Sequence, residues 1–100
     1  MSKFRLTNKA VEDLTLIWTY TYDNWSERQA DIYYEMIIAS CQEAADNPLT
    51  SGKKYEQIAE NIYGFRAASH VIFYRIVLDA EIEIIRILHS SMDLKNRIKE

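Results

Sequence analysis

The chain has 100 residues, 48% of them hydrophobic and 27% charged, which is enough for one compact core and too little for two. Two glycines and one proline exclude collagen-like and linker-type sequences, and the apolar fraction excludes an intrinsically disordered chain. The formal net charge of -3 argues against broad electrostatic capture of nucleic acid, although residues 51–100, with 8 basic and 7 acidic side chains, are the more basic half. We therefore expect a single domain over residues 1–100 that has no sequence-specific nucleic-acid binding of its own.

Cysteine usage and the N-terminus indicate the compartment. Cys41 is the only cysteine, so no intrachain disulfide can form, and a reducing compartment is expected. The first residues contain no apolar signal segment, and the longest apolar runs are far shorter than a membrane span. We expect a cytoplasmic protein that does not associate with a membrane.

The first elements follow from hydrophobic spacing. Residues 3–7 alternate between apolar and polar side chains, with Phe4 and Leu6 on one face, which predicts a short strand. From Asn8 to about Asn24 the spacing changes to three and four residues, which predicts a helix. Its predicted apolar face consists of Val11, Leu14, Trp18, Tyr22 and Trp25, with Ala10 and Ile17 alongside.

A second helix is predicted directly after the first. Ser26 followed by Gln29 is a capping-box pattern that starts it, and Pro48 ends it at Asn47. Its predicted apolar face consists of Ala30, Tyr34, Ile37, Cys41 and Ala44, widened by Tyr33, Ile38 and Ala45. Because almost no loop separates the two helices, they should pack as an antiparallel hairpin.

The second half of the chain favours strands. Residues 49–54 read as a surface loop, and residues 55–61 fit either a helical turn or an irregular segment. Residues 62–67, 70–77 and 82–89 are predicted strands, with a tight connection at 78–81 and a polar tail at the end. The fold class is therefore α+β, with an N-terminal strand and an α-helical hairpin packed on an antiparallel β-sheet. Because the last two strands are apolar on both faces, we expect a partner to cover part of the sheet.

Few residues suggest catalytic or metal chemistry. The sequence contains no glycine-rich phosphate loop, no CxxC and no HExxH, so no cofactor is expected. His70 and His89 could bind a metal together with Asp93, but hydrogen-bonded histidines at strand ends are the favoured interpretation, and no metal site is expected. Cys41 is expected to be a core residue and not a nucleophile.

Aromatic and basic side chains are the candidates for partner contacts. Core packing is expected for most of the helical aromatics, whereas exposed ones, with Trp18 and Tyr22 as the candidates, would suit a protein interface. Arg75 and Arg86 lie in the middle of strands, so either an acidic side chain such as Glu83 or a bound partner should pair with them. The candidate contacts with a partner are Arg66, Arg75, Arg86, His89, Trp18 and Tyr22.

Two segments carry a family resemblance. HVIFYR at residues 70–75 and IEIIRILHSSMD at residues 82–93 resemble the C-terminal signature of the ParE toxins in the RelE/ParE superfamily. The opening FRLTNKAVEDLTLIW and the later NPLTSGKKY resemble the family's first strand and helix and its loop, so the resemblance covers nearly the whole chain.

The resemblance implies the toxin of a type II toxin–antitoxin system, held inactive in a hetero-oligomer by a ParD-like antitoxin. A ParE toxin inhibits DNA gyrase by binding it, which implies growth inhibition, a role in plasmid stabilisation and no enzymatic activity. The alternative is a RelE-like, ribosome-dependent mRNA interferase, which would use His89 as the acid–base group and Arg66, Arg75 and Arg86 at the phosphate. A structural subunit that is harmless on its own is a third interpretation.

Overall fold

The computed structural model describes residues 2–78 and 81–98, which form three helices and a five-stranded sheet. In chain order the elements are β1 (Lys3–Leu6), α1 (Asn8–Asn24), α2 (Glu27–Asp46), β2 (Lys53–Lys54), β3 (Tyr63–Ala67), β4 (His70–Leu78), β5 (Glu81–His89) and α3 (Leu94–Arg97). The strand order across the sheet is β1-β5-β4-β3-β2. The predicted connection at residues 78–81 includes residues outside the described ranges.

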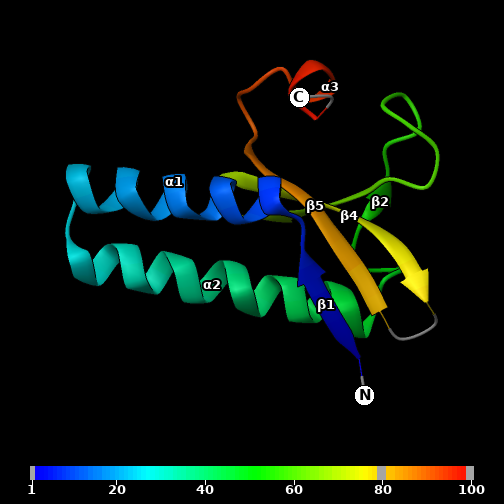
Figure 1. Ribbon diagram of the computed structural model, residues 1–100, viewed down its shortest axis with the longest axis horizontal. Helices are drawn as coiled ribbons and strands as arrows, with labels where there is room; N and C mark the ends of the chain where they lie inside the picture. Colours follow the sequence, from blue (N-terminus) through cyan, green and yellow to red (C-terminus); the bar gives the residue numbers. More distant parts are fainter. Residues whose placement is uncertain (1, 79–80, 99–100) are drawn as a thin grey trace.

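The helical hairpin is confirmed. The side chain of Thr7 accepts a hydrogen bond from the backbone of Ala10 and starts α1, and Ser26 does the same for α2 through Gln29. Helix α2 ends at Asp46, with Asn47 as its C-terminal cap before Pro48. Figure 1 shows the two helices lying antiparallel, with their connected ends extending beyond the sheet.

The α+β class is confirmed, with two differences in the sheet. Strands β2 to β5 pair antiparallel, whereas β1 pairs parallel to β5, so the sheet is mixed. Alternation of side chains along β1 shows which of them face the core but carries no information on strand direction. Strand β2 lies in the segment that was predicted as a loop. The strand was not predicted because its two exposed lysines show no hydrophobic periodicity.

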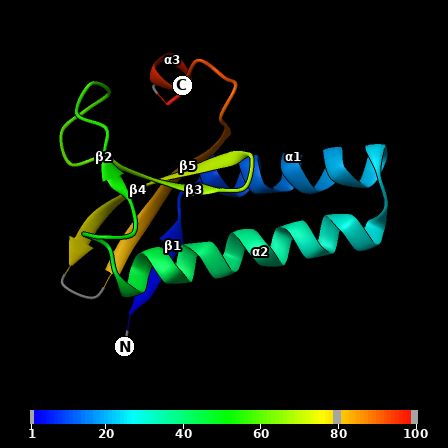
Figure 2. The ribbon, with the colours of Figure 1, turned by 180° about the vertical axis from the view of Figure 1, so that it is seen from behind.

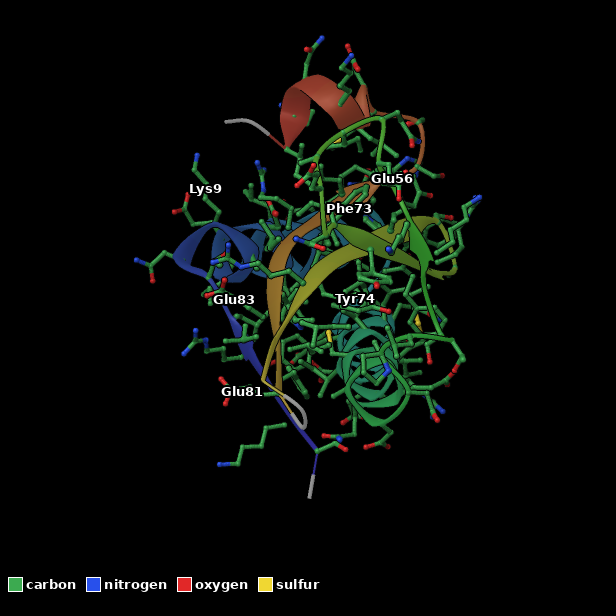
Figure 3. The ribbon with its side chains drawn as sticks, turned by 90° about the vertical axis from the view of Figure 1, so that its right-hand side faces the viewer. Lys9, Glu56, Phe73, Tyr74, Glu81 and Glu83 are labelled. Atoms are coloured by element: carbon green, nitrogen blue, oxygen red, sulfur yellow. The ribbon has the colours of Figure 1, made fainter. Side chains whose placement is uncertain are left out.

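At one end of the sheet, the chain itself covers both faces. Tyr74 lies in the main core under the helices, whereas its neighbour Phe73 lies on the opposite face (Figure 3). There the segment before β3, through Tyr55 and Ile58, and the C-terminal segment, through Leu94 and Ile98, pack around Phe73. At this end of the sheet no partner is therefore needed, and the covering of another part of the sheet by a partner stays a prediction. The predicted polar tail contains α3, which lies with the 55–61 segment on the side of the sheet away from α2 (Figures 1 and 2).

The predicted core face of α1 holds at Ala10, Leu14 and Ile17 but fails at Val11, Tyr22 and Trp25, which are exposed. The buried residues are Ala10, Asp13 and Leu14, while Val11 and Trp25 are 48% and 76% exposed. The error arises because the outer half of the hairpin has no sheet beneath it, so its aromatic residues have little to pack against (Figure 1). On α2 the prediction holds at Ala30, Ile37, Cys41 and Ala44, all fully buried, but fails at Tyr34, which is exposed.

One buried ion pair joins α1, β5 and α3. Arg86 donates to both carboxylate oxygens of Asp13, with Nε–Oδ2 and Nη2–Oδ1 distances of 2.7 and 3.0 Å. Asp13 Oδ2 also accepts the backbone N–H of Ile87 at 3.0 Å, and Arg86 Nη1 donates to the carbonyl of Arg97 at 2.7 Å. Since β1 pairs with β5 only as far as Ile84, Asp13 satisfies an amide on the part of β5 that β1 does not reach.

We expect replacement of Asp13 to be strongly destabilising. Asp13→Asn leaves the Arg86 guanidinium buried without its counter-charge and should lower the free energy of unfolding by about 3–5 kcal/mol, measured by chemical denaturation. The control is Arg75→Ala, which breaks the exposed pair with Glu83 and should cost no more than about 1 kcal/mol. The double variant Asp13→Leu/Arg86→Leu should recover part of the loss, since no charge is left alone in the interior. Equal losses in Asp13→Asn and Arg75→Ala would contradict this role.

Candidate functional site

Two grooves flank α1. The first, which we call the histidine groove, lies between α1 and the ends of β4 and β5 and has a volume of about 790 Å³. Its lining includes Tyr20, Trp25, Tyr33, His70, His89 and Ser91. The second, which we call the hairpin groove, has a volume of about 460 Å³ and is lined by Leu6, Val11, Leu14, Thr15, Trp18, Asp31 and Tyr34.

The histidine groove is built around two imidazoles. His70 and His89 stand directly opposite each other on β4 and β5, with ring centroids 5.2 Å apart and the rings edge to face. The hydroxyl of Tyr33 from α2 lies 2.6 Å from His70 Nδ1. Ser91 Oγ lies 2.7 Å from His89 Nδ1, and the Ser91 backbone N–H donates to the same atom at 3.1 Å. Each imidazole is thus held by a hydrogen bond at Nδ1.

Burial changes the titration of this cluster. Desolvation, followed by the nearby His89, lowers the pKa of His70 from 6.5 to about 4, against an opposing effect of Asp13. Desolvation also raises the pKa of Tyr33, although the backbone N–H of Ser69 opposes the shift. At neutral pH, therefore, His70 is an uncharged imidazole and Tyr33 a protonated phenol, so both take part in the cluster as hydrogen-bonding groups and not as charges.

The hairpin groove is apolar and carries one acid. Trp18 and Tyr22 stack with ring centroids 5.2 Å apart and planes 17° from parallel. The indole N–H of Trp18 donates to Asp31 Oδ1 at 3.0 Å, which fixes the ring between α1 and α2. Tyr22 and Tyr34 remain exposed beside it. Rigid aromatic side chains with exposed faces are typical of protein interfaces.

The three candidate arginines each have a different partner. Arg66 is exposed and donates to the carbonyl of Ala68 in the β3–β4 turn. Arg75 pairs with Glu83 at 2.6 Å on the surface, and Arg86 pairs with Asp13 in the interior. Of the two kinds of partner expected for Arg75 and Arg86, an acidic side chain or a bound partner, the structure shows acidic side chains for both.

The remaining candidates are Asp93, which is hydrogen-bonded, and Cys41, which is buried. Within residues 2–78 and 81–98 no three His, Cys, Asp or Glu side chains form a group that could hold a metal ion. Asp93 accepts a hydrogen bond from Asn96 Nδ2 at 2.6 Å. Cys41 is a core residue, as expected, and burial raises the pKa of its thiol to about 12.

Sequence reasoning missed several side chains that shape these sites. Asp13 carried a signal, because an acid three residues after Ala10 sits on the buried helical stripe. Tyr33 and Ser91 carried none, since their partners His70 and His89 are brought to them only by the packing of α2 on β4 and by the turn after β5.

Comparison with known proteins identifies the family. The family model described as "ParE toxin of type II toxin-antitoxin system, parDE" matches residues 4–94. Toxin ParE1 of Mycobacterium tuberculosis is 32% identical over 97 residues, covering 97% of this chain and 98% of that protein. Toxin ParE1 of Caulobacter vibrioides is 35% identical over 95 residues, covering 95% and 96%. The chain belongs to the ParE toxin family of type II toxin–antitoxin systems.

Solved structures agree on the fold. A chain of the chromosomal ParDE system from P. aeruginosa superposes with a TM-score of 0.71 at 19% identity, covering 89% of this chain and 96% of that one. A chain of the RelBE2 toxin–antitoxin complex from Mycobacterium tuberculosis superposes with a TM-score of 0.67 at 18% identity, covering 88% and 96%. Among the described residues, no helix is long and apolar enough to cross a membrane.

The histidine cluster predicts a pH dependence of stability. The pKa of His70 in the folded protein, about 4, lies below its ordinary value of 6.5, so the unfolded chain takes up the proton first as the pH falls. This contribution destabilises the fold progressively from pH 6.5 toward about pH 4 and is absent above pH 6.5. As the pH is lowered across that range, the denaturant concentration at the unfolding midpoint should therefore fall less steeply for His70→Gln than for the natural chain. Identical slopes for the two proteins would contradict the assignment.

Proposed function

We propose that this ParE-family toxin inhibits DNA gyrase by binding to it and is neutralised by a ParD-like antitoxin in a cytoplasmic hetero-oligomer. The observation that carries the proposal is the match to the ParE toxin family over residues 4–94. A small toxin that acts by binding needs a presented surface and no reacting group, and the hairpin groove together with the exposed aromatic side chains of Tyr22 and Tyr34 beside it supplies such a surface.

The RelE-like alternative has less support. General acid–base chemistry on RNA needs several cationic groups converging on one phosphate. Here Arg75 and Arg86 are engaged by Glu83 and Asp13, and Arg86 is buried. In the proposed function, therefore, Arg86 acts by positioning α1 and β5, while the exposed guanidinium groups of Arg66 and Arg75 are the candidates for contact with the target.

We place the antitoxin on the hairpin groove. Trp18 and Tyr22 form a stacked, partly exposed pair that needs no rearrangement to bind an apolar side chain. Asp31 is the charged side chain among the residues that line this groove, so the bound antitoxin segment should be apolar with a flanking Lys or Arg. A segment that orders on the toxin would lose the contact when it is proteolysed, and this loss would release the toxin.

Gyrase inhibition is tested directly by DNA supercoiling. The purified chain should inhibit supercoiling of relaxed plasmid by gyrase, and cleaved DNA should accumulate. Addition of the cognate antitoxin in equimolar amount should restore supercoiling, because the toxin in the complex cannot reach its target. Full gyrase activity at a large excess of toxin, together with ribosome-dependent mRNA cleavage, would refute the proposal and favour the interferase.

Antitoxin binding is tested on the stacked pair. Tyr22→Ala removes one exposed ring and should weaken antitoxin binding by about tenfold, because aromatic residues dominate such interfaces. Calorimetric titration of the toxin with antitoxin measures the effect. The matched control is Trp25→Ala, which removes an exposed ring from the histidine groove at the C-terminal cap of the same helix and should leave the affinity unchanged. If the two variants have equal affinities, the antitoxin does not occupy the hairpin groove.

A further inference from the structure

The two sides of the histidine groove carry different kinds of side chain, and the proposed toxin function assigns a role to neither side. On the α1 side stand Tyr20 and Trp25, whose side chains are among the most exposed large aromatics of the chain, at 66% and 76%. On the other side stand the imidazoles of His70 and His89 at the ends of β4 and β5. Aromatic rings with open faces thus lie across one cavity from polar ring nitrogens.

The hydrogen bonds determine which ring nitrogens carry protons. Ser91 donates its backbone N–H to His89 Nδ1, so the proton of the neutral His89 ring is on Nε2. A protonated phenol is a stronger hydrogen-bond donor than a neutral imidazole N–H, so Tyr33 donates its hydroxyl proton to His70 Nδ1, which places the His70 proton on Nε2 as well. Both imidazoles are therefore hydrogen-bond donors at Nε2.

Neither of these two donors is buried, and both histidines line the groove. The hydrogen bonds of both histidines described above are at Nδ1. Among the described residues no side-chain nitrogen or oxygen is both buried and without a hydrogen-bond partner, so Nε2 of each ring is accessible from outside. A ligand atom that accepts hydrogen bonds can therefore meet His70 and His89 together.

The charge of the described lining does not oppose an anion. Asp13 is the acid among the described residues that line the groove, and Arg86 neutralises it through two hydrogen bonds. The described lining therefore contains no carboxylate without a counter-charge, and nothing of that kind would repel a negatively charged group. The hairpin groove on the other flank of α1 differs, because its Asp31 is hydrogen-bonded to an uncharged indole.

We infer that the histidine groove binds a nucleotide unit, with its base stacked on the aromatic wall of Trp25 and Tyr20 and its phosphate accepting from His70 and His89. Stacking on exposed aromatics is tolerant of base identity, which suits a site without base-reading groups. The groove volume of about 790 Å³ lies within the range of roughly 300–1,000 Å³ typical of small-ligand sites. A free nucleotide and a single strand of nucleic acid both supply this chemistry.

The inference is tested by titrating the full-length toxin, labelled with nitrogen-15, with 5′-AMP, adenosine, inorganic phosphate and a short oligothymidylate. AMP should bind saturably and shift the amide signals of Ser69 and Ser91 and the indole N–H of Trp25. Adenosine and phosphate should each bind more weakly, because each supplies one half of the contacts. Tighter binding of the oligothymidylate than of AMP would identify a single strand as the source of the nucleotide, and the reverse order would identify the free nucleotide.

Variants separate this site from the antitoxin surface. Trp25→Ala should weaken AMP binding by about tenfold through loss of stacking, and His89→Phe should weaken it by removing one donor. The matched control Tyr22→Ala, on the other flank of α1, should leave AMP binding unchanged. Absence of saturable AMP binding would overturn the inference. So would phosphate binding as strong as that of AMP and indifferent to Trp25→Ala, or tighter binding of a glutamate-rich peptide than of AMP.

Discussion

The arrangement of this toxin depends on the buried pair of Asp13 and Arg86. A charge in the interior is tolerated only when its partner and its remaining hydrogen-bonding capacity are both supplied. Asp13 accepts from the Arg86 guanidinium and from the Ile87 amide, and Arg86 reaches on to the backbone of Arg97. Through these contacts α1 lies against the edge of β5 and the C-terminal segment is held over the opposite face of the sheet.

The position of α1 creates the two grooves. Because its first half is held against β5, its second half extends with α2 past the end of the sheet (Figure 1). Side chains on one flank then face His70 and His89, and those on the other flank face α2 and Asp31. One helix thereby borders a largely apolar cavity that contains two imidazoles on one side and an apolar groove with one acid on the other. The two flanks are suited to chemically different partners.

The comparison of sequence with structure shows where periodicity is informative. Both helices, the Ser26 cap and C-terminal end of α2, and the strands β3 to β5 were predictable, since capping residues, Pro48 and the runs of β-branched side chains act locally. Among the candidate residues, Trp18 and Tyr22 were identified from their type and spacing. Their exposure was not predictable, because the same spacing describes a buried helical stripe when a sheet lies beneath it. The covering of Phe73 likewise depends on segments without strong periodicity.

What the sequence by itself determined is the family, the α+β class and the inventory of side chains that could act. The family signature and the hydrophobic pattern are local properties of the chain, so no knowledge of long-range packing was needed. The tertiary structure alone decided which of these side chains meet. The pairing of Asp13 with Arg86, the parallel addition of β1 and the meeting of Tyr33 with His70 join residues far apart in sequence. Such contacts arise because helices and strands are packed against one another, and a one-dimensional pattern carries no record of that packing.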